Sequence, residues 1–285
     1  MRTYLDCFPC FMEQALRASR IATHDEKEIK RVLDEVGRML SSIPIESTPP
    51  ESGKIIYQKV SEITGIRDPY KEIKKKSTDT ALTLYPSLKN EINKEQDMLL
   101  TAIRIAIAGN VIDFGANSHF NIEQEIDEIL RKDFAICDYE KFKAKLNESN
   151  EILYIGDNAG ECVFDRILIE EMKKTVTYVV RDVPIINDAT YEDAIQAEID
   201  KVATIISSGT DAPGTILETC NPEFKKIYDR AKFIISKGQG NYEALSNERR
   251  PIFFLLKVKC HVIANDIGVD KGDIVLKKSE SLNRV

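Results

Sequence analysis

Acidic and amide side chains follow a strand-like segment in the middle of the sequence. The apolar run Ile152–Ile155 leads directly into Gly156, Asp157 and Asn158, and helical spacing follows from Cys162 to Met172. Glycine before the acid allows the chain to turn sharply. Adjacent carboxylate and amide oxygens at the end of a buried strand suit a hard divalent cation. The alternative is that these two side chains only form a turn that caps the following helix.

Four more apolar runs of strand length follow, and ligand-binding residue types come after each of them. The runs are Thr175–Val180, Ala203–Ile206, Phe233–Ile235 and Ile252–Val258. After them come, in order, Asp188, Asp211, the segment 237–241, and the pair Lys257 and Lys259. Because the carboxyl ends of parallel strands meet at one edge of a sheet, we expect these residues to converge.

Their combination predicts metal-assisted chemistry on a phosphate ester. Acids bind a metal, glycine turns present backbone N–H groups to an oxyanion, and lysine supplies a positive charge for a phosphoryl oxygen. Each residue also has a structural alternative. Asp188 can cap the helix predicted at Tyr191–Lys201, Asp211 can form a turn with Gly214, and Lys259 can be a solvated strand end.

Composition places the chain among ordinary globular proteins. It has 285 residues, of which 42% are hydrophobic and 31% charged, with a net charge of −7. We expect no general affinity for nucleic acid, which usually needs a basic face. No apolar run approaches the ~20 residues of a membrane span, and the N-terminus lacks the apolar core of a signal peptide, so a cytoplasmic location is expected. Six cysteines in this length do not predict a disulfide scaffold.

Residues 1–148 are predicted to form an all-α domain without strands. Helical spacing and start signals predict helices at Cys7–Ile21, Asp25–Leu40, Ile55–Ile63, Asp68–Leu84, Glu95–Asp113, Asn121–Lys132 and Asp138–Asn147. Three prolines predict a loop over 41–52, and Pro86 is predicted to end the fourth helix. The helix Glu95–Asp113 is the most apolar and should be buried.

Residues 149–285 are predicted to form an α/β domain. The strand-like runs alternate with helical segments such as Tyr191–Lys201 and Asn221–Arg230. Strands that alternate with helices imply a mainly parallel sheet covered on both faces. The junction near 146–151 is short and polar, so we expect the two domains to pack together.

Several short motifs together resemble the damage-control phosphatase family, also called ARMT-like and formerly a domain of unknown function. The family motifs are Gly156-Asp-Asn-Ala-Gly-Glu161, Ile186-Asn-Asp-Ala-Thr190 and Lys237-Gly-Gln-Gly-Asn-Tyr-Glu243. Three more segments resemble its prokaryotic cysteine-motif branch: Asp6–Phe11, Gly109–Gly115 and Lys259-Cys260. The resemblance implies a helical N-terminal domain on a Rossmann-like three-layer α/β/α domain. It also implies metal-dependent hydrolysis of small phosphomonoesters, such as sugar phosphates or damaged metabolites.

Site residues follow from the resemblance position by position. Asp157, Asn158 and Asp188 would hold the divalent metal, which we expect to be Mn²⁺, Ni²⁺, Co²⁺ or Mg²⁺. The phosphoryl group would be held by Lys237, Gly238, Gln239, Gly240 and Asn241. Three more residues are expected near the substrate: Lys259, which matches the family's C-terminal lysine, and Asn110 and Asp113 from the helical half.

The expected mechanism has a cation that polarises the phosphoryl oxygen and orients water, with Lys237 stabilising the charge of the transition state. Asp211 and Glu161 are candidates for the base that deprotonates the water. An aspartyl-phosphate on Asp157 is the alternative, because phosphatase nucleophiles also follow strands.

Two other classes of function remain open. One is a carboxyl methyltransferase, a label that eukaryotic relatives have carried, although the turn Gly156–Gly160 places acids where a methyl donor would need glycines. The other is a non-catalytic metal-binding, ligand-binding or redox-sensing protein that uses Cys7 and Cys10. Those cysteines can instead be structural, or Cys260 can join them in a metal site.

Overall fold

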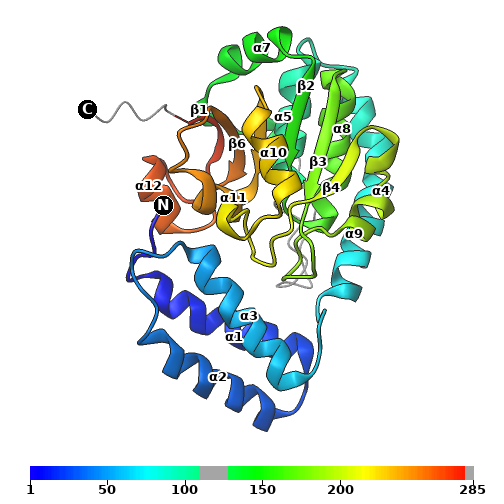
Figure 1. The fold of residues 1–285 in the computed structure, drawn as a ribbon. Coiled ribbons are helices and arrows are strands. Elements are labelled where there is room, and N and C mark those ends of the chain that lie inside the picture. Colours follow the sequence, from blue (N-terminus) through cyan, green and yellow to red (C-terminus); the bar gives the residue numbers. More distant parts are fainter. Residues whose placement is uncertain (110–127, 280–285) are drawn as a thin grey trace, which may run out of the picture.

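The structure, a computed structural model, describes residues 1–109 and 128–279, and a seven-stranded sheet lies at its centre (Figure 1). The strand order is β1-β7-β6-β5-β2-β3-β4. Strands β2 to β6 run parallel, while β7 is antiparallel to β6 and parallel to β1. The strands are β1 (Phe134–Cys137), β2 (Glu151–Ile155), β3 (Thr175–Val180), β4 (Thr204–Ser207), β5 (Ile234–Lys237), β6 (Ile252–Lys257) and β7 (Ile274–Lys278). The predicted α/β class with a mainly parallel sheet is confirmed.

Helices cover both faces of this sheet. One face carries α4 (Lys71–Ile92), α5 (Met98–Gly109), α7 (Tyr139–Glu148), α8 (Cys162–Met172) and α9 (Tyr191–Gln196). The other carries α10 (Pro222–Arg230), α11 (Gly238–Leu245) and α12 (His261–Ile267). Alternate side chains of β2 serve the two layers: Ile152 and Tyr154 pack on the first face, Leu153 and Ile155 on the second. A strand buried on both faces must be apolar throughout, which is why β2 was recognisable in the sequence.

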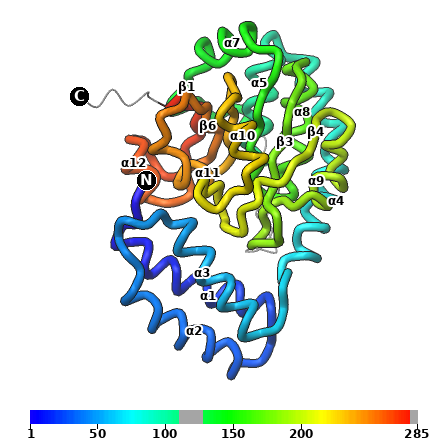
Figure 2. The backbone as a smooth tube through the Cα atoms, in the orientation of Figure 1, coloured from blue at the N-terminus to red at the C-terminus, as the bar shows by residue number. Residues whose placement is uncertain are grey.

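Three N-terminal helices form a separate group beside the α/β layers (Figures 1 and 2). They are α1 (Cys7–Ala22), α2 (Glu26–Leu40) and α3 (Pro49–Thr64), and they share a hydrophobic cluster that includes Phe11, Val36 and Val60. By contrast, α4, α5 and α7 pack on the sheet. The division of the chain at residue 148 stays a prediction, and the hydrophobic clusters set α1–α3 apart from the rest.

Several element boundaries differ from the predictions. Helix α3 begins at Pro49, where a loop was predicted, because Thr48 and Glu51 form a capping box and proline suits the first helical turn. Helix α4 continues through Pro86 to Ile92, so the predicted stop was wrong. The burial of its last turn, which includes Leu88 and Ile92, stabilises the helix although proline removes one N–H donor.

Two strands at the β1 end of the sheet were also missed. The prediction of no strand before residue 148 was wrong, because β1 lies at Phe134–Cys137. It is four residues long and half-buried at an edge, so its alternation is too short to recognise. The second strand that was not predicted is β7, at Ile274–Lys278. The predicted helix Asn121–Lys132 lies mostly outside the described residues.

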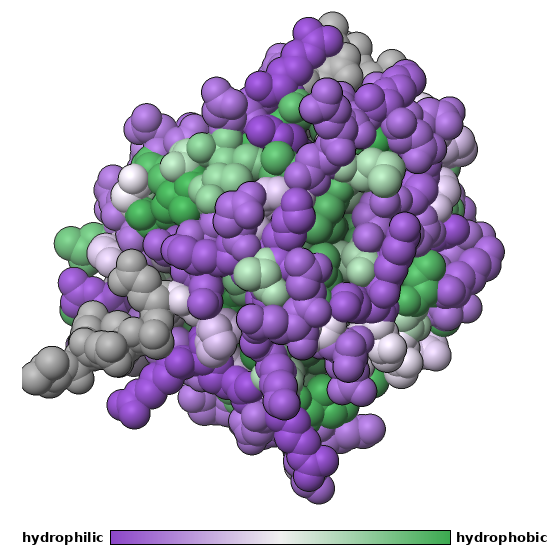
Figure 3. Space-filling view, turned by 90° about the horizontal axis from the view of Figure 1, so that it is seen from above, coloured by the Kyte–Doolittle hydropathy of each residue, from purple (hydrophilic) through white to green (hydrophobic). Residues whose placement is uncertain are grey.

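No helix in residues 1–109 and 128–279 is long and apolar enough to cross a membrane. Figure 3 shows hydrophilic residues over most of one face of the molecule, with hydrophobic residues in separate patches.

Candidate active site

A cavity of about 310 Å³ lies where the carboxyl ends of the central strands face α1 and α3. Asp157 and Asn158 follow β2, and Asp188 lies in the loop after β3. All three line this cavity, together with residues of α1 and α3 such as Phe11 and Tyr57. The sequence predicted that residues at the strand ends would converge. Asp157, Asn158 and Asp188 do converge on this cavity.

Backbone hydrogen bonds hold the two acidic segments together. The N–H of Ala189 donates to the carbonyl of Asp157 at 2.8 Å, and the N–H of Ala159 donates to the carbonyl of Asn187 at 2.9 Å. These bonds flank an isolated antiparallel bridge between Asn158 and Asp188. The main chain, and not only the side chains, thus brings the segments after β2 and β3 side by side.

The two carboxyl groups are in an environment that disfavours their charge. Burial raises the pKa of Asp157 well above its usual range, and the charges of Glu161 and Asp188 raise it further. Burial also raises the pKa of Asp188, although Arg181 opposes this. A divalent cation held by Asp157 and Asp188 would favour the charged form of both groups.

The amide oxygen of Asn158 is the third candidate donor. The Nδ2 of this amide donates to Glu161 Oε1 at 2.6 Å and to Asp157 Oδ2 at 3.4 Å, so hydrogen bonds to two carboxylates hold the side chain in place. The donor set of two carboxylates and one amide oxygen fits a hard cation such as Mn²⁺ or Mg²⁺. Within the described parts of the chain, no group of three or more His, Cys, Asp and Glu residues is placed to hold a metal ion. The candidate set has only two such residues, Asp157 and Asp188, with the amide of Asn158 as its third donor.

Arg181, which the sequence reasoning did not assign to the site, is fully buried behind these ligands. Its Nε lies 2.7 Å from Asp188 Oδ2, and its other nitrogens donate to Thr215 Oγ1 and Asn241 Oδ1, both at 3.0 Å. The guanidinium also lies 3.9 Å from Asp157 Oδ1. The only sequence signal was its position directly after β3, because burial of a charged side chain is not visible in a local pattern.

Lys237 lies beneath the cavity and not in its wall. Its Nζ forms ion pairs with Asp165 at 2.7 Å and Glu161 at 3.1 Å, and the side chain is fully buried. Both tyrosines of the neighbouring strands, Tyr154 and Tyr178, donate to the same Asp165. A buried ammonium is stable only beside such partners. Direct contact of Lys237 with a phosphoryl group, as predicted, would require the side chain to leave this network.

Gly238 passes so close to Asp157 that no other residue fits. Its φ is +75°, and a Cβ built on it would lie 1.8 Å from Asp157 Oδ2. The start of α11 therefore packs directly against the first candidate ligand. This contact explains the glycine after Lys237, which the sequence analysis assigned to a phosphate-binding turn.

The remaining predicted substrate residues divide into two groups. Gln239, Gly240 and Lys259 line the cavity, and Gln239 Oε1 accepts a hydrogen bond from the backbone N–H of Lys259 at 3.1 Å. Asn241 is buried and bonded to the carbonyls of Gly156 and Lys237 through its Nδ2. These hydrogen bonds give Asn241 a structural role, and its side chain does not line the cavity. The predicted residues Asn110 and Asp113 lie outside the described residues.

Neither candidate base faces this cavity. Asp211 forms an ion pair with Lys54 at 2.6 Å and borders a neighbouring cavity of about 350 Å³. Glu161 is buried between Asn158 and Lys237. Both assignments stay predictions, but proton transfer through either residue would need another group or water between it and the substrate.

Cys7 and Cys10 lie on the cavity wall with Cys260, as free cysteines from two parts of the fold. Burial raises the pKa of the Cys7 thiol and of the Cys10 thiol. Reactive cysteines have lowered pKa values. The raised pKa values of both thiols give no support for thiolate chemistry at these positions.

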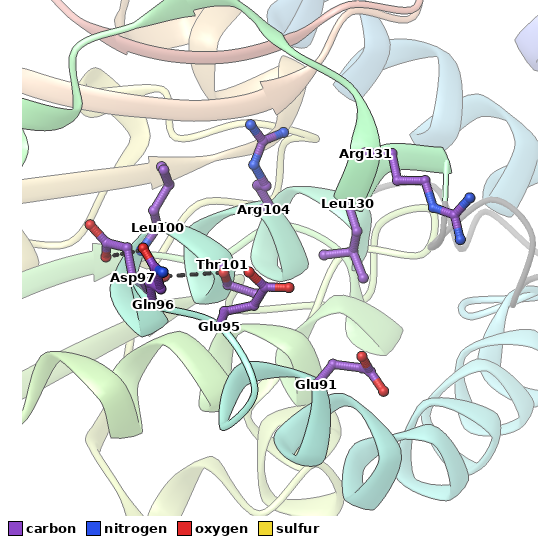
Figure 4. Close-up of a pocket in the computed structure, with 9 residues that line it drawn as sticks. All are labelled: Glu91, Glu95, Gln96, Asp97, Leu100, Thr101, Arg104, Leu130 and Arg131. Carbon is purple, nitrogen blue, oxygen red and sulfur yellow. Dashed lines mark hydrogen bonds between the residues drawn. The ribbon is translucent and has the colours of Figure 1, made fainter.

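A larger cavity of about 540 Å³ lies elsewhere, between the end of α4 and the start of α5 (Figure 4). Two of its polar side chains, those of Asp97 and Arg104, are engaged in structural contacts. Asp97 accepts hydrogen bonds from the N–H of Leu100 and the hydroxyl of Tyr139, and Arg104 lies over the ring of Phe134. Its size alone does not make it the functional site.

Comparisons with known proteins agree with this arrangement. A family model described as the damage-control phosphatase ARMT1-like domain matches residues 3–275. A damage-control phosphatase from Archaeoglobus fulgidus is 36% identical over 287 residues, which cover 96% of this chain and 98% of the relative. An uncharacterized protein from Methanocaldococcus jannaschii is 40% identical over 286 residues, with 96% and 94% covered.

A third relative links the sequence to a solved structure. A damage-control phosphatase from Pyrococcus horikoshii is 34% identical, over 98% of this chain and 99% of the relative. The crystal structure of a DUF89 family protein from the same organism, at 2.04 Å resolution, matches with a TM-score of 0.88 and 33% identity. That match covers 98% of this chain and 100% of the other. The shared fold therefore extends over almost the full length of the chain and includes α1–α3.

Proposed function

Since the chain belongs to the damage-control phosphatase ARMT1-like family, we propose that it is a damage-control phosphatase that hydrolyses small phosphomonoesters with a divalent cation. Asp157, Asn158 and Asp188 would hold this cation. The cation would supply Lewis-acid polarisation of the phosphoryl oxygen and orientation of an attacking water. Mn²⁺, Ni²⁺, Co²⁺ and Mg²⁺ all accept such oxygen donors.

One observation carries the proposal: the buried side chains of Asp157, Asn158 and Asp188 converge on a cavity at the carboxyl ends of parallel strands. Burial raises the pKa of Asp157 and of Asp188, with the neighbouring charge of Glu161 as a further cause for both. A bound cation would favour the charged form of both carboxyl groups. The position agrees with the general location of ligands in open α/β sheets.

The other residues of the cavity suit a phosphate ester. Lys259 provides a positive charge that lowers the pKa of Asp157, and so lies on the side of the acidic ligands. Gln239 and Gly240 present the first turn of α11 to the cavity, where helix N–H groups favour an oxyanion. A volume of about 310 Å³ restricts the substrate to a small metabolite such as a sugar phosphate.

Lys237 acts in this scheme through its carboxylate partners. It neutralises Glu161, which in turn orients the amide of Asn158. Loss of the ammonium would leave Glu161 and Asp165 charged and buried without a cation. We therefore assign Lys237 to positioning of the ligand Asn158, and the phosphoryl group to the backbone of α11 and to Lys259.

The test is phosphate release from a panel of sugar phosphates and p-nitrophenyl phosphate by Asp188→Asn and by Asp182→Asn. The second aspartate lies in the same loop, but is exposed and accepts a hydrogen bond from Ser207. We expect Asp188→Asn to lose at least ~10²-fold in kcat/KM and Asp182→Asn to retain wild-type activity. Equal activity of Asp188→Asn and the wild type would contradict the assignment of the ligand.

A further inference from the structure

The loop that carries Asp188 contains a residue in an unfavourable backbone conformation. The N–H of Asp188 donates to the carbonyl of Ile185 at 3.1 Å, which closes a tight turn around Ile186 and Asn187. Ile186 has a φ of +46°. Glycine usually takes such a turn position, because positive φ is sterically disfavoured for β-branched residues.

The side chain of Ile186 is anchored on the N-terminal helices. It packs against the hydrophobic cluster of α1–α3, whose buried members include Phe11 and Val60. Ile186 also borders both the candidate active-site cavity and the neighbouring cavity of about 350 Å³. It therefore forms part of the wall between them, where the loop after β3 meets the helices.

The two residues after Ile186 belong to the candidate metal site. The carbonyl of Asn187 accepts from the N–H of Ala159, and Asp188 supplies a predicted ligand. A strained conformation persists only where the surroundings impose it. Here the surroundings on one side are the α1–α3 cluster, and on the other side the segment that carries Asp157 and Asn158.

We infer that Ile186 is a positioning residue: the packing of its partly buried side chain against α1–α3 holds the turn that presents Asp188 to the metal site. The inference rests on the proposed function, because it takes Asp188 as a metal ligand. It gives the N-terminal helices a role in forming the site beyond covering it. Removing the anchor should weaken metal binding although no ligand is changed.

Four variants separate anchoring from general stability. Ile186→Gly relieves the unfavourable φ but removes the anchor, and Ile186→Ala removes most of the anchor while keeping a Cβ. Ile186→Val keeps a β-branched apolar side chain, so it should keep both the anchor and the Mn²⁺ affinity. Val183→Ala is the matched control, since Val183 is an apolar residue of the same loop that is 41% exposed.

Two measurements are made on the full chain after chelation. The first is the dissociation constant for Mn²⁺ alone, followed by electron paramagnetic resonance. The second is hydrogen exchange at the amide of Ala159, which donates to Asn187 and reports the order of the turn without metal. Thermal denaturation confirms that each variant is folded, and Ile186→Ala gives the comparison if Ile186→Gly is unstable.

We expect Ile186→Gly and Ile186→Ala to bind Mn²⁺ about 10-fold more weakly and to exchange the Ala159 amide about 10-fold faster. Ile186→Val and Val183→Ala should stay within about twofold of the wild type in both measurements. Unchanged Mn²⁺ affinity and unchanged exchange in Ile186→Gly would overturn the inference. If the wild type bound no Mn²⁺ but Ile186→Gly still accelerated exchange, the metal assignment would fail while the anchoring of the turn would stand.

Discussion

Arg181 shows how a single buried charge supports the candidate ligands. Its guanidinium donates to Asp188, Thr215 and Asn241, and so links the segments after β3, β4 and β5. A buried arginine offsets part of the negative charge of the ligands when no cation is bound. Its Nε pairs with Oδ2 of Asp188 at 2.7 Å, which restricts the orientation of this carboxylate.

We predict that Arg181→Met lowers the free energy of unfolding by about 3–5 kcal/mol, because it leaves the buried Asp188 without its partner. Urea unfolding of the metal-free protein measures this loss. The double variant Arg181→Met/Asp188→Asn should recover part of it, since the uncompensated charge is then removed. Lys75→Met, which breaks an exposed pair with Asp79, should leave the free energy of unfolding nearly unchanged. Equal losses for the two single variants would contradict this account.

Glu243 on α11 gives the site region a dependence on pH. Burial raises its pKa from 4.5 to about 7, and the charge of Asp266 adds to this effect, while Gln239 and the α-ammonium of Met1 oppose it. The folded protein therefore holds a proton on Glu243 that the unfolded chain releases. The resulting stabilisation is complete below pH 4.5 and is lost as the pH rises toward 7.

We predict that Glu243→Gln has the stability of the wild type near pH 4.5 and exceeds it by roughly 2 kcal/mol at pH 8, a value reduced because the side chain is partly exposed. Thermal denaturation at the two pH values measures the difference. Glu62→Gln, which makes the same substitution at an exposed position of α3, serves as the control for the loss of a surface carboxylate. A pH-independent difference for Glu243→Gln would show that its carboxyl is not shifted.

At the scale of elements, the start of α11 and the end of β2 are fitted to each other through Gly238. Alanine at Gly238 would introduce both an unfavourable φ and a clash with Asp157. The two effects can be separated, because the chain contains another glycine with a similar φ. Gly268, at the C-terminal cap of α12, has a φ of +83° and nothing within 4 Å of a built Cβ. Alanine at Gly268 meets only the backbone penalty, whereas alanine at Gly238 also meets Asp157.

We predict that Gly268→Ala costs about 1–2 kcal/mol of stability and leaves phosphate release unchanged. Gly238→Ala should cost more and reduce phosphate release at least ~10²-fold, since Asp157 must move. Parallel measurements of urea unfolding and of p-nitrophenyl phosphate turnover separate the two effects. Full activity in Gly238→Ala would show that the position of Asp157 is not important for the reaction.

The elements also show what a local pattern can predict. Continuous apolar runs predicted β2, β3, β5 and β6, because strands buried on both faces need apolar residues at every position. The start of α3 was missed, because its two prolines suggested a loop and the cap at Thr48 was overlooked. The short edge strand β1 and the helices α11 and α12, of seven or eight residues, gave too little periodicity.

At the scale of the whole molecule, the cavity is formed by two groups of elements. The strand ends supply Asp157, Asn158 and Asp188, and α1 and α3 supply the opposite wall. The rule that parallel strand ends share one edge predicted the first group from the sequence. The second group depended on how α1–α3 pack, which no local pattern specifies.

The direction of side chains was the part of the site that the sequence did not reveal. Lys237 and Asn241 lie in the predicted segment but point into the protein interior, where their partners are Asp165, Glu161 and Arg181. The alternation of β5 and the first turn of α11 determine this direction. Partners so distant in sequence become apparent only when the tertiary structure is known.

The most direct test of the central claim is to titrate Mn²⁺ into the chelated wild-type protein while phosphate release from p-nitrophenyl phosphate is measured. The account predicts no turnover before Mn²⁺ is added, and a rise that saturates with the same dissociation constant as Mn²⁺ binding measured directly. In Asp157→Asn both the binding and the rise should shift to higher Mn²⁺ concentration. Full turnover by the chelated protein, with no response to Mn²⁺, would contradict a metal-dependent phosphatase with ligands Asp157, Asn158 and Asp188.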